Sequence, residues 1–197
     1  MKKQNTAQTI GGLVILACVL LFLFFRMSQS LGNQTEQQKE QTEVEKLATY
    51  DMENNYPKTV RDVIKLYTRY LKCLYNEKLS DEDIEALNKK MRELYCEKLK
   101  NYNDESAQLV ALKTEIATYR KDETTMIGYT MSEASQIEYE KIDEVEFAKL
   151  DVIFNMKVKT VPINKSEEFV LEQDAFGRWK IYGWTINTND NNIESGD

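Results

Sequence analysis

The side chains in this sequence that could do chemistry are mainly aromatic and acidic. The chain of 197 residues contains 11 Tyr, 7 Phe and 2 Trp. Aromatic residues with a polar tip are frequent in ligand cavities and at protein interfaces. Trp179 and Trp184 are five positions apart, which predicts opposite faces of a regular strand and one side chain in the core. The candidate cavity or interface aromatics are Tyr129, Trp179, Tyr182 and Trp184.

Acidic residues form several short clusters, and paired carboxylates can transfer protons or bind calcium. No cluster has the spacing of a calcium loop with a central glycine. Glu138 and Glu140 would share one face of a strand, which is typical of an outer face in contact with water. We therefore expect solvated surface at these clusters, with no metal site and no cofactor: Asp81 to Asp83, Glu138 with Glu140, Asp143 to Glu146, and Glu167 with Glu168.

Histidine is absent from the sequence. This excludes Ser-His-Asp triads, Cys-His dyads, H-E-x-x-H zinc sites and imidazole general bases. A lone Asp or Tyr could still transfer a proton, but no motif marks one. We expect no catalytic residue and no enzymatic activity.

The three cysteines lack the C-x-x-C spacing of a redox or metal motif. Cys73 and Cys96 would lie on consecutive helices that turn near Lys78, offset along the axis by about 20 Å. A disulfide needs Cα atoms about 4.4–6.8 Å apart. We expect two free, buried thiols, although a second helix that bends back sharply would allow a disulfide.

An apolar segment near the N-terminus, Ile10 to Phe25, reads IGGLVILACVLLFLFF. As a helix, residues 9–27 would span about 28 Å, close to the ~30 Å hydrocarbon core of a bilayer. A cleaved signal peptide would have a shorter run and a small-x-small site. A lipoprotein modified at Cys18 would turn polar after it, yet Val19 to Phe25 remain apolar. The sequence therefore predicts a retained anchor that contacts the lipid bilayer through Ile10 to Phe25.

The flanking charges predict the orientation of this anchor. Lys2 and Lys3 precede it, whereas Arg26 is the last basic residue before Lys39. We expect residues 1–9 in the cytoplasm and the C-terminal part outside the cell, in a single-pass membrane protein. Residues 27–197 carry 23 of the 26 basic and all 33 acidic side chains, a net charge of −10. This argues against nucleic acid and anionic membrane surfaces as partners.

A polar linker is expected at residues 28–55, since residues 33–42 have no apolar side chain. It would be a flexible stalk up to about Glu43, followed by a short helix with Val44 and Leu47 on one face. The folded domain would then cover residues 56–188, and residues 189–197 would form a flexible tail.

Three helices are predicted at the start of this domain from apolar residues three and four positions apart. They run from Pro57 to Asn76, from Ser80 to about Lys100, and from Asn103 or Asp104 to about Tyr119. Ser80 and Asp83 resemble a capping box at the start of the second. The three apolar faces are Val60, Val63, Ile64, Tyr67, Tyr70, Leu71 and Leu74; Ile84, Leu87, Met91, Leu94 and Tyr95; and Leu109, Leu112, Ile116 and Tyr119.

Strands follow the helices, because the apolar period changes to two from Ala148 to Val158. Pro162 would interrupt this strand, and further strands are expected at residues 125–131, 136–142, 167–173 and 178–188, with a turn at Gly177. Helices followed by closely spaced strands indicate an α+β fold. We expect two to three helices packed on a curved antiparallel sheet of four to five strands.

The segments YPKTVRDVIKLYTRYLKCLYNEKLSDEDIEALNKKMRELYC and RWKIYGW resemble the cone-shaped domains of the nuclear transport factor two-like superfamily. The resemblance covers residues 56–187. With its N-terminal span, the whole chain is similar to uncharacterised single-pass envelope proteins of Gram-positive bacteria. The resemblance implies a fold more than an activity. Enzymes with such folds often use an Asp-His pair, which this chain cannot supply.

Two functions are compatible with these observations. The first is a membrane-tethered, non-enzymatic ectodomain that assembles with other envelope proteins; in layout it resembles cone-domain components of bacterial secretion and conjugation machines. The second is a tethered binding module for a small apolar ligand held in the cone. A cavity with convergent polar groups would favour ligand binding, whereas a filled cone with an exposed apolar edge or face would favour assembly.

Overall fold

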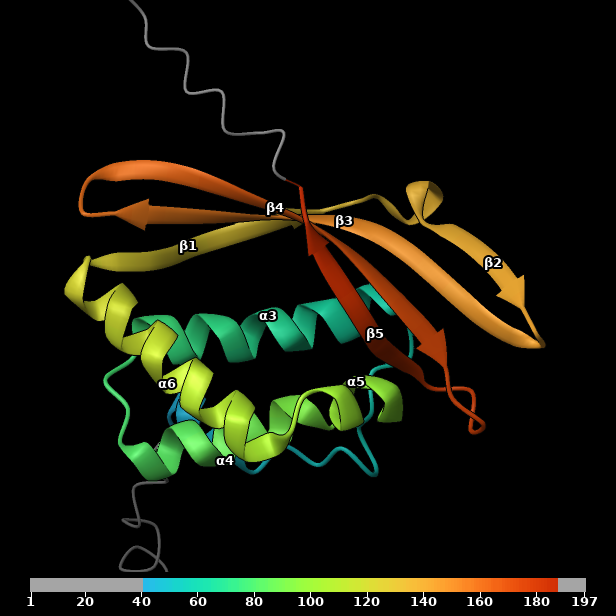
Figure 1. Ribbon diagram of the computed structural model, residues 1–197, viewed down its shortest axis with the longest axis horizontal. Coiled ribbons are helices and arrows are strands. Elements are labelled where there is room, and N and C mark those ends of the chain that lie inside the picture. Colours follow the sequence, from blue (N-terminus) through green and yellow to red (C-terminus); the bar gives the residue numbers. More distant parts are fainter. Residues whose placement is uncertain (1–40, 188–197) are drawn as a thin grey trace, which may run out of the picture. The chain divides into compact units, whose positions relative to one another are not determined.

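A computed structural model describes residues 41–187 of the chain, which form an α+β fold as predicted (Figure 1). The expected anchor at residues 10–27, the stalk up to residue 40 and the tail at 189–197 lie outside the described residues. Within residues 41–187, no helix has the length and apolar character needed to cross a membrane. The helices are α2 (Glu43–Ala48), α3 (Val60–Asn76), α4 (Asp81–Arg92), α5 (Glu97–Tyr102), α6 (Glu105–Lys121) and the 3-10 helix η1 (Ala134–Gln136). The strands are β1 (Thr124–Met131), β2 (Glu138–Ile142), β3 (Val145–Val158), β4 (Val161–Gln173) and β5 (Trp179–Ile186).

Helix α2 lies in the segment expected to be a linker, at the position predicted for a short helix. Its first turn is closed by a capping box in which Thr42 and Glu45 bond reciprocally to each other's backbone N–H. Leu47 is fully buried, and its carbonyl accepts a hydrogen bond from the Tyr70 hydroxyl at 3.1 Å. Residues from Thr42 onward are therefore packed on the domain.

The apolar faces predicted for the first two long helices are buried in the core, from Val60 to Leu74 on α3 and from Ile84 to Met91 on α4. The capping box of Ser80 and Asp83 is confirmed: each side chain accepts a hydrogen bond from the other residue's backbone N–H, at 3.1 Å. Burying one apolar face of each helix supplies most of its stability, since short helices are marginal alone.

The second helix ends at Arg92, so our prediction that it continues to about Lys100 is wrong. Leu94 and Cys96 leave the helix and pair with β5. The Ile181 N–H donates to the Leu94 carbonyl at 2.8 Å, and the Cys96 N–H donates to the Ile181 carbonyl at 2.9 Å. These tertiary hydrogen bonds override the helical propensity of the segment. Cys96 then caps α5. Cys96 and Cys73 are both free and buried, as expected.

The sheet has the order β1–β3–β4–β5, and all its pairs are antiparallel. β1 pairs with the C-terminal half of β3, while β2 pairs with the N-terminal end of β3 on the same edge. The long helices lie on one side of the sheet (Figure 1). The core lies between them and the sheet face that carries Val152, Phe154, Phe169 and Leu171.

Strand β4 is longer than predicted, because it starts at Val161 and not at Glu167. The chain turns at Lys159, whose φ is 55°, and Pro162 pairs with Lys157 in the ladder. Proline lacks a backbone N–H and is tolerated where a strand is paired on one side only. β5 pairs with Glu167–Gln173 alone, so Pro162 meets this condition.

A β-bulge at Tyr182 contradicts our prediction that Trp179 and Trp184 point to opposite faces. Trp179 pairs with Gln173 and Trp184 with Phe169, while the register shifts between them. Cross-strand partners share a face, and residues 169 and 173 are an even number apart on β4. The extra residue at the bulge therefore places both tryptophans on the inner face.

Candidate functional site

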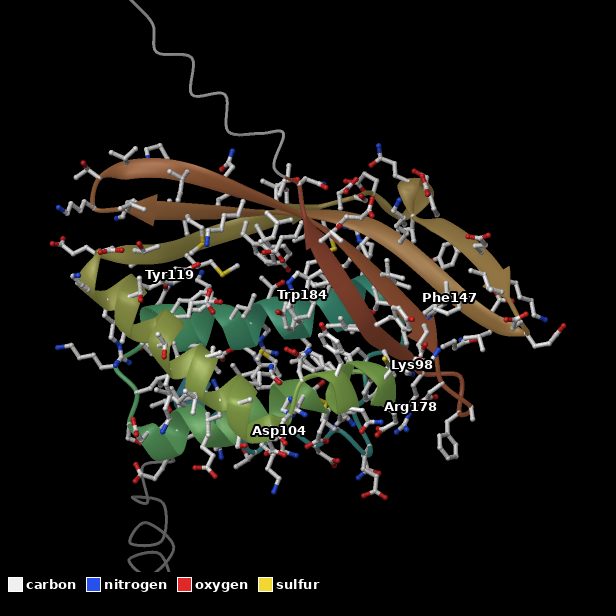
Figure 2. All side chains as sticks on the ribbon, in the orientation of Figure 1. Lys98, Asp104, Tyr119, Phe147, Arg178 and Trp184 are labelled. Atoms are coloured by element: carbon white, nitrogen blue, oxygen red, sulfur yellow. The ribbon has the colours of Figure 1, made fainter. Side chains whose placement is uncertain are left out.

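A cavity of about 490 Å³ lies between α3, α6 and the inner face of the sheet. Aromatic rings form much of its wall, and Figure 2 shows Tyr119 and Trp184 between the helices and the sheet. Its size and mixed lining are typical of small-molecule sites. The aromatic and sulfur-containing lining residues are Tyr67, Tyr75, Tyr95, Tyr119, Phe154, Trp184, Met91, Met126 and Met156.

The cavity exists because α6 covers the sheet incompletely. Of the predicted apolar face of α6, Leu112 and Ile116 are buried, whereas Leu109 and Tyr119 are partly buried. Ala111, one turn from Glu115, is an exposed cavity-lining residue with a small side chain. Because α6 contributes few large apolar side chains to its side of the cavity, space remains between this helix and the sheet.

Trp184 is the centre of an aromatic cluster in this cavity. Its ring stacks on Phe169 at a centroid distance of 5.7 Å. It also lies 6.0 Å from Tyr67 and 6.1 Å from Tyr95. These contacts fix the Trp184 ring, although about a third of the residue remains exposed. The cluster therefore offers a rigid aromatic surface to a bound molecule.

Two charged residues of β4 point into the cavity. Lys165 pairs with Phe154 and Glu167 pairs with Val152, and both of these β3 residues are buried on the core face. Because cross-strand partners share a face, Lys165 and Glu167 are directed inward. Charged side chains are almost never placed inside without a partner or a functional reason.

Burial raises the pKa of Glu167 from the ordinary 4.5 to about 7. The Lys165 ammonium opposes this rise and the Glu115 carboxylate adds to it. Near neutral pH, Glu167 is thus distributed between its acid and its carboxylate form. It can donate a hydrogen bond in the first form and accept one in the second.

Lys165, Tyr119, Glu115 and Tyr75 form a polar cluster at one wall. The Lys165 ammonium donates to the Tyr119 hydroxyl and lies 4.9 Å from the centre of its ring. The Tyr75 and Tyr119 rings meet edge to face at 4.7 Å. Burial, together with the nearby Glu115 carboxylate, raises the pKa of both phenols, which therefore stay neutral.

The opposite end of the cavity contains a chain of hydrogen bonds that starts at Arg92. This guanidinium donates to the side-chain oxygen of Gln108, to the Asn103 carbonyl at 2.9 Å and to the Lys100 carbonyl at 3.3 Å. The Gln108 amide nitrogen donates to the Tyr95 hydroxyl at 3.3 Å. Burial raises the pKa of Tyr95 to about 12, so this phenol is also neutral.

The four aromatic residues predicted from the sequence lie in different places. Trp184 lines the cavity. Tyr129 pairs with Phe154 and packs against the core. The Trp179 ring contacts the Tyr139 ring at 5.8 Å.

Tyr182, the bulged residue, lies on the outer face, where the structure has a second hollow of about 710 Å³. Its ring meets Phe147 edge to face at 5.7 Å, and the Lys98 ammonium lies 5.4 Å from its centre. Figure 2 shows Lys98 and Phe147 at this end of the sheet. Glu138 and Glu140 border the hollow and are exposed, as predicted for an outer face in contact with water.

Across residues 41–187, no three His, Cys, Asp or Glu side chains are grouped in a way that could hold a metal ion. The groups that line the cavity provide hydrogen bonds and one carboxyl group, Glu167, that titrates near neutral pH.

Sequence reasoning missed most of the polar groups of the cavity. The sequence predicts Glu167 and Glu168 as a solvated pair, because clusters of acidic residues are usually exposed. The signal was present in the predicted strand, since Phe169 and Leu171 alternate with the outward residues and Glu167 lies on the same face as both. Arg92, Gln108 and Tyr95 come together only through the break after α4, which no local pattern indicates.

The sequence profile of a family described as a domain of unknown function, DUF6715, matches residues 1–184, and the chain belongs to this family. A comparison with curated proteins gave no match.

Proposed function

We propose that this member of the DUF6715 family binds a small, mostly apolar molecule in the cavity between α3, α6 and the sheet. The observation that carries the proposal is the pair of inward-facing charges, Lys165 and Glu167, at the wall of an aromatic cavity of about 490 Å³. A core built only for stability would have apolar residues there. Polar groups that converge in an apolar cavity are the mark of a ligand site.

A cavity with convergent polar groups favours a binding module over an assembly domain. Binding also needs no catalytic constellation, and we therefore propose a receptor or scavenger and not an enzyme. Glu167 and the tyrosines then orient the ligand through hydrogen bonds.

Assembly with other envelope proteins is the second candidate, supported by the outer hollow. Phe147 and Tyr182 form an aromatic pair there, with Val145 and Val170 beside them. Aromatic residues are enriched at the centres of protein interfaces. The two functions use opposite faces of the sheet and are compatible with each other.

We further propose that residues 10–27 remain as a single membrane span, with the N-terminus in the cytoplasm and the ligand-binding domain outside the cell. The support is the uninterrupted run Ile10 to Phe25 and the basic residues before it. The α+β architecture with a cavity on its helical side is compatible with the resemblance to the nuclear transport factor two-like superfamily. The domain would then sample small molecules at the cell envelope.

Methionine methyl groups provide a direct test of the cavity. Full-length protein in membrane mimetic, labelled with ¹³C at its methionine methyls, is titrated with 2-methylnaphthalene, an apolar two-ring probe. We expect shifts at Met126 and Met156, which line the cavity, and none at Met52 and Met131, which do not. Shifts at all methionines, or at none, would contradict the proposal.

A matched pair of variants on α6 controls this test. Ala111 and Ala117 are both exposed alanines, but only Ala111 lines the cavity. Ala111→Phe should fill the cavity entrance and weaken the binding of 2-methylnaphthalene at least tenfold. Ala117→Phe should leave the affinity within twofold of the wild type.

A further inference from the structure

The Arg92 side chain has an unusual environment for a buried cation. The residue is 7% exposed, and its three hydrogen-bond acceptors are two backbone carbonyls and the neutral Gln108 side chain. Among residues 41–187, no carboxylate forms an ion pair with it. Buried guanidinium groups are normally paired with an acid. The nearest carboxylate that feels this charge is Asp104, whose pKa Arg92 helps to lower, although it forms no direct ion pair with the guanidinium.

Arg92 also sets the orientation of the Gln108 amide. A guanidinium has only donors, so the group that faces Arg92 must be the oxygen of Gln108. The amide nitrogen then faces Tyr95 and donates to its hydroxyl oxygen at 3.3 Å. Because that oxygen is already an acceptor, the Tyr95 proton can be donated to the neighbouring Tyr67 hydroxyl or to a ligand oxygen that takes its place.

The other charged groups that line the cavity are Lys165, Glu115 and Glu167. Lys165 and Glu115 have opposite charges and share Tyr119 as a neighbour at the far wall. Glu167 is the remaining inward carboxyl group: its acid form is a donor, and its carboxylate form is an acceptor on the side of Tyr67. The Trp184 ring, 6.1 Å from the Tyr95 ring, provides an apolar surface beside the Tyr95 hydroxyl.

Resting on the proposed function, we infer that the ligand carries a hydrogen-bond acceptor, a ketone or carboxylate oxygen, on an apolar body, and that this oxygen binds to the Tyr95 hydroxyl oriented by Arg92 and Gln108. The apolar body packs on Trp184. Cationic amines are excluded at this position, because an ammonium group would face a donor with a buried guanidinium behind it.

Four probes with the same two-ring body test the inference in the full-length protein. They are 2-acetylnaphthalene, 2-naphthoate, 2-naphthylmethylammonium and 2-methylnaphthalene, each titrated while the Met126 and Met156 methyl signals are followed. We expect at least one of the two acceptor probes to bind tenfold more tightly than 2-methylnaphthalene, and the ammonium probe to bind no more tightly than 2-methylnaphthalene. The stronger acceptor probe then distinguishes a neutral from an anionic ligand.

The outcomes separate the two proposals. If no probe shifts Met126 or Met156, the cavity is not a site for such molecules and both proposals fail. If 2-methylnaphthalene binds as tightly as both acceptor probes, or the ammonium probe binds most tightly, the acceptor inference is overturned while ligand binding stands.

Two variants identify the residues that select the acceptor. Tyr95→Phe removes the donor with little change in shape, and should reduce the acceptor probe's advantage over 2-methylnaphthalene to threefold or less. Gln108→Glu replaces the amide nitrogen with an oxygen that cannot donate to Tyr95. This variant should also reduce the acceptor probe's advantage over 2-methylnaphthalene to threefold or less. Unchanged Met52 and Met131 signals would show that both variants are folded. An undiminished tenfold advantage in both variants would contradict the assignment of Tyr95.

Discussion

Replacing Glu167 with glutamine should make the protein more stable at alkaline pH. The side chain keeps its shape and loses its ionisation. In the folded protein, burial raises the pKa of Glu167 from 4.5 to about 7. The folded state therefore holds this proton more tightly than the unfolded state does. The stabilisation by the protonated form is complete below about pH 4.5 and is lost as the pH rises through about 7.

The magnitude follows from the difference between the two pKa values. A tenfold change in proton affinity corresponds to about 1.4 kcal/mol, so ionisation of Glu167 destabilises the folded state by at most about 3–4 kcal/mol. The carboxyl group keeps some contact with solvent, which reduces the expected value to about 2 kcal/mol. Glu167→Gln should recover this amount at about pH 8.5 and less than about 1 kcal/mol at about pH 5.

Urea unfolding of wild type and Glu167→Gln at these two pH values measures the effect, with tryptophan fluorescence as the signal. The other titrating groups are common to both proteins, so their contributions cancel in the difference. Equal differences in unfolding free energy at the two pH values would show that Glu167 is ionised normally in the folded protein. Our account of the cavity's electrostatics would then be refuted.

The neighbouring residue provides the control. Glu168 lies on the opposite face of β4 and forms an ion pair with Lys149 at 2.8 Å. Exposed ion pairs contribute about 0–1 kcal/mol. Glu168→Gln should therefore lower the unfolding free energy by less than about 1 kcal/mol, with no gain at alkaline pH.

Three further predictions concern stability and reactivity. Arg92→Met should lower the unfolding free energy by about 1–3 kcal/mol, because it leaves partly buried carbonyls without donors. Arg69→Met breaks a half-exposed ion pair with Glu43 and should change it by less than about 1 kcal/mol; urea unfolding of both variants compares the two effects. Ser80→Ala should lower it by about 1 kcal/mol through loss of the α4 cap, and an unchanged midpoint would contradict the role of that cap. In a Cys18→Ser background, an aromatic disulfide reagent at about pH 8 should label Cys73 and Cys96 only after denaturation. Both thiols are buried, and burial raises the pKa of Cys73 to about 11. Rapid labelling of the native protein would argue against this packing.

The helices were predictable because their apolar residues repeat every three or four positions and their caps are local. Leu87 and Leu74 are buried where that period places them. The end of the second helix was not predictable, because the hydrogen bonds between Ile181 and the segment Leu94 to Cys96 join residues far apart in the chain. Propensity alone cannot indicate such a partner.

The candidate site was predictable only at Trp184. In a regular strand, Trp179 and Trp184 would point to opposite faces of the sheet. The bulge at Tyr182 adds one residue between the two tryptophans and places both on the inner face. Lys165 and Glu167 are charged residues on the inward face of β4. In a sequence, a charged residue normally predicts an exposed position, so these two were not expected in a cavity. Functional sites are the places where that rule fails, and a single sequence does not mark them.

The hydrogen bonds that hold Leu94 and Cys96 to Ile181 also restrict how the sheet could grow. An edge strand with free backbone groups is a template for a strand from another chain. On the edge of β5, the backbone groups of Ile181 are already hydrogen-bonded to Leu94 and Cys96. Within the described part of the chain, the stretch of β5 beyond this contact runs from Gly183 to Ile186. On the opposite side of the sheet, the edge is divided between β1 and β2 and interrupted by η1. The uncovered stretches are short on β5 and bulged on β1, which limits the addition of strands from other chains and favours recognition of a partner through side chains.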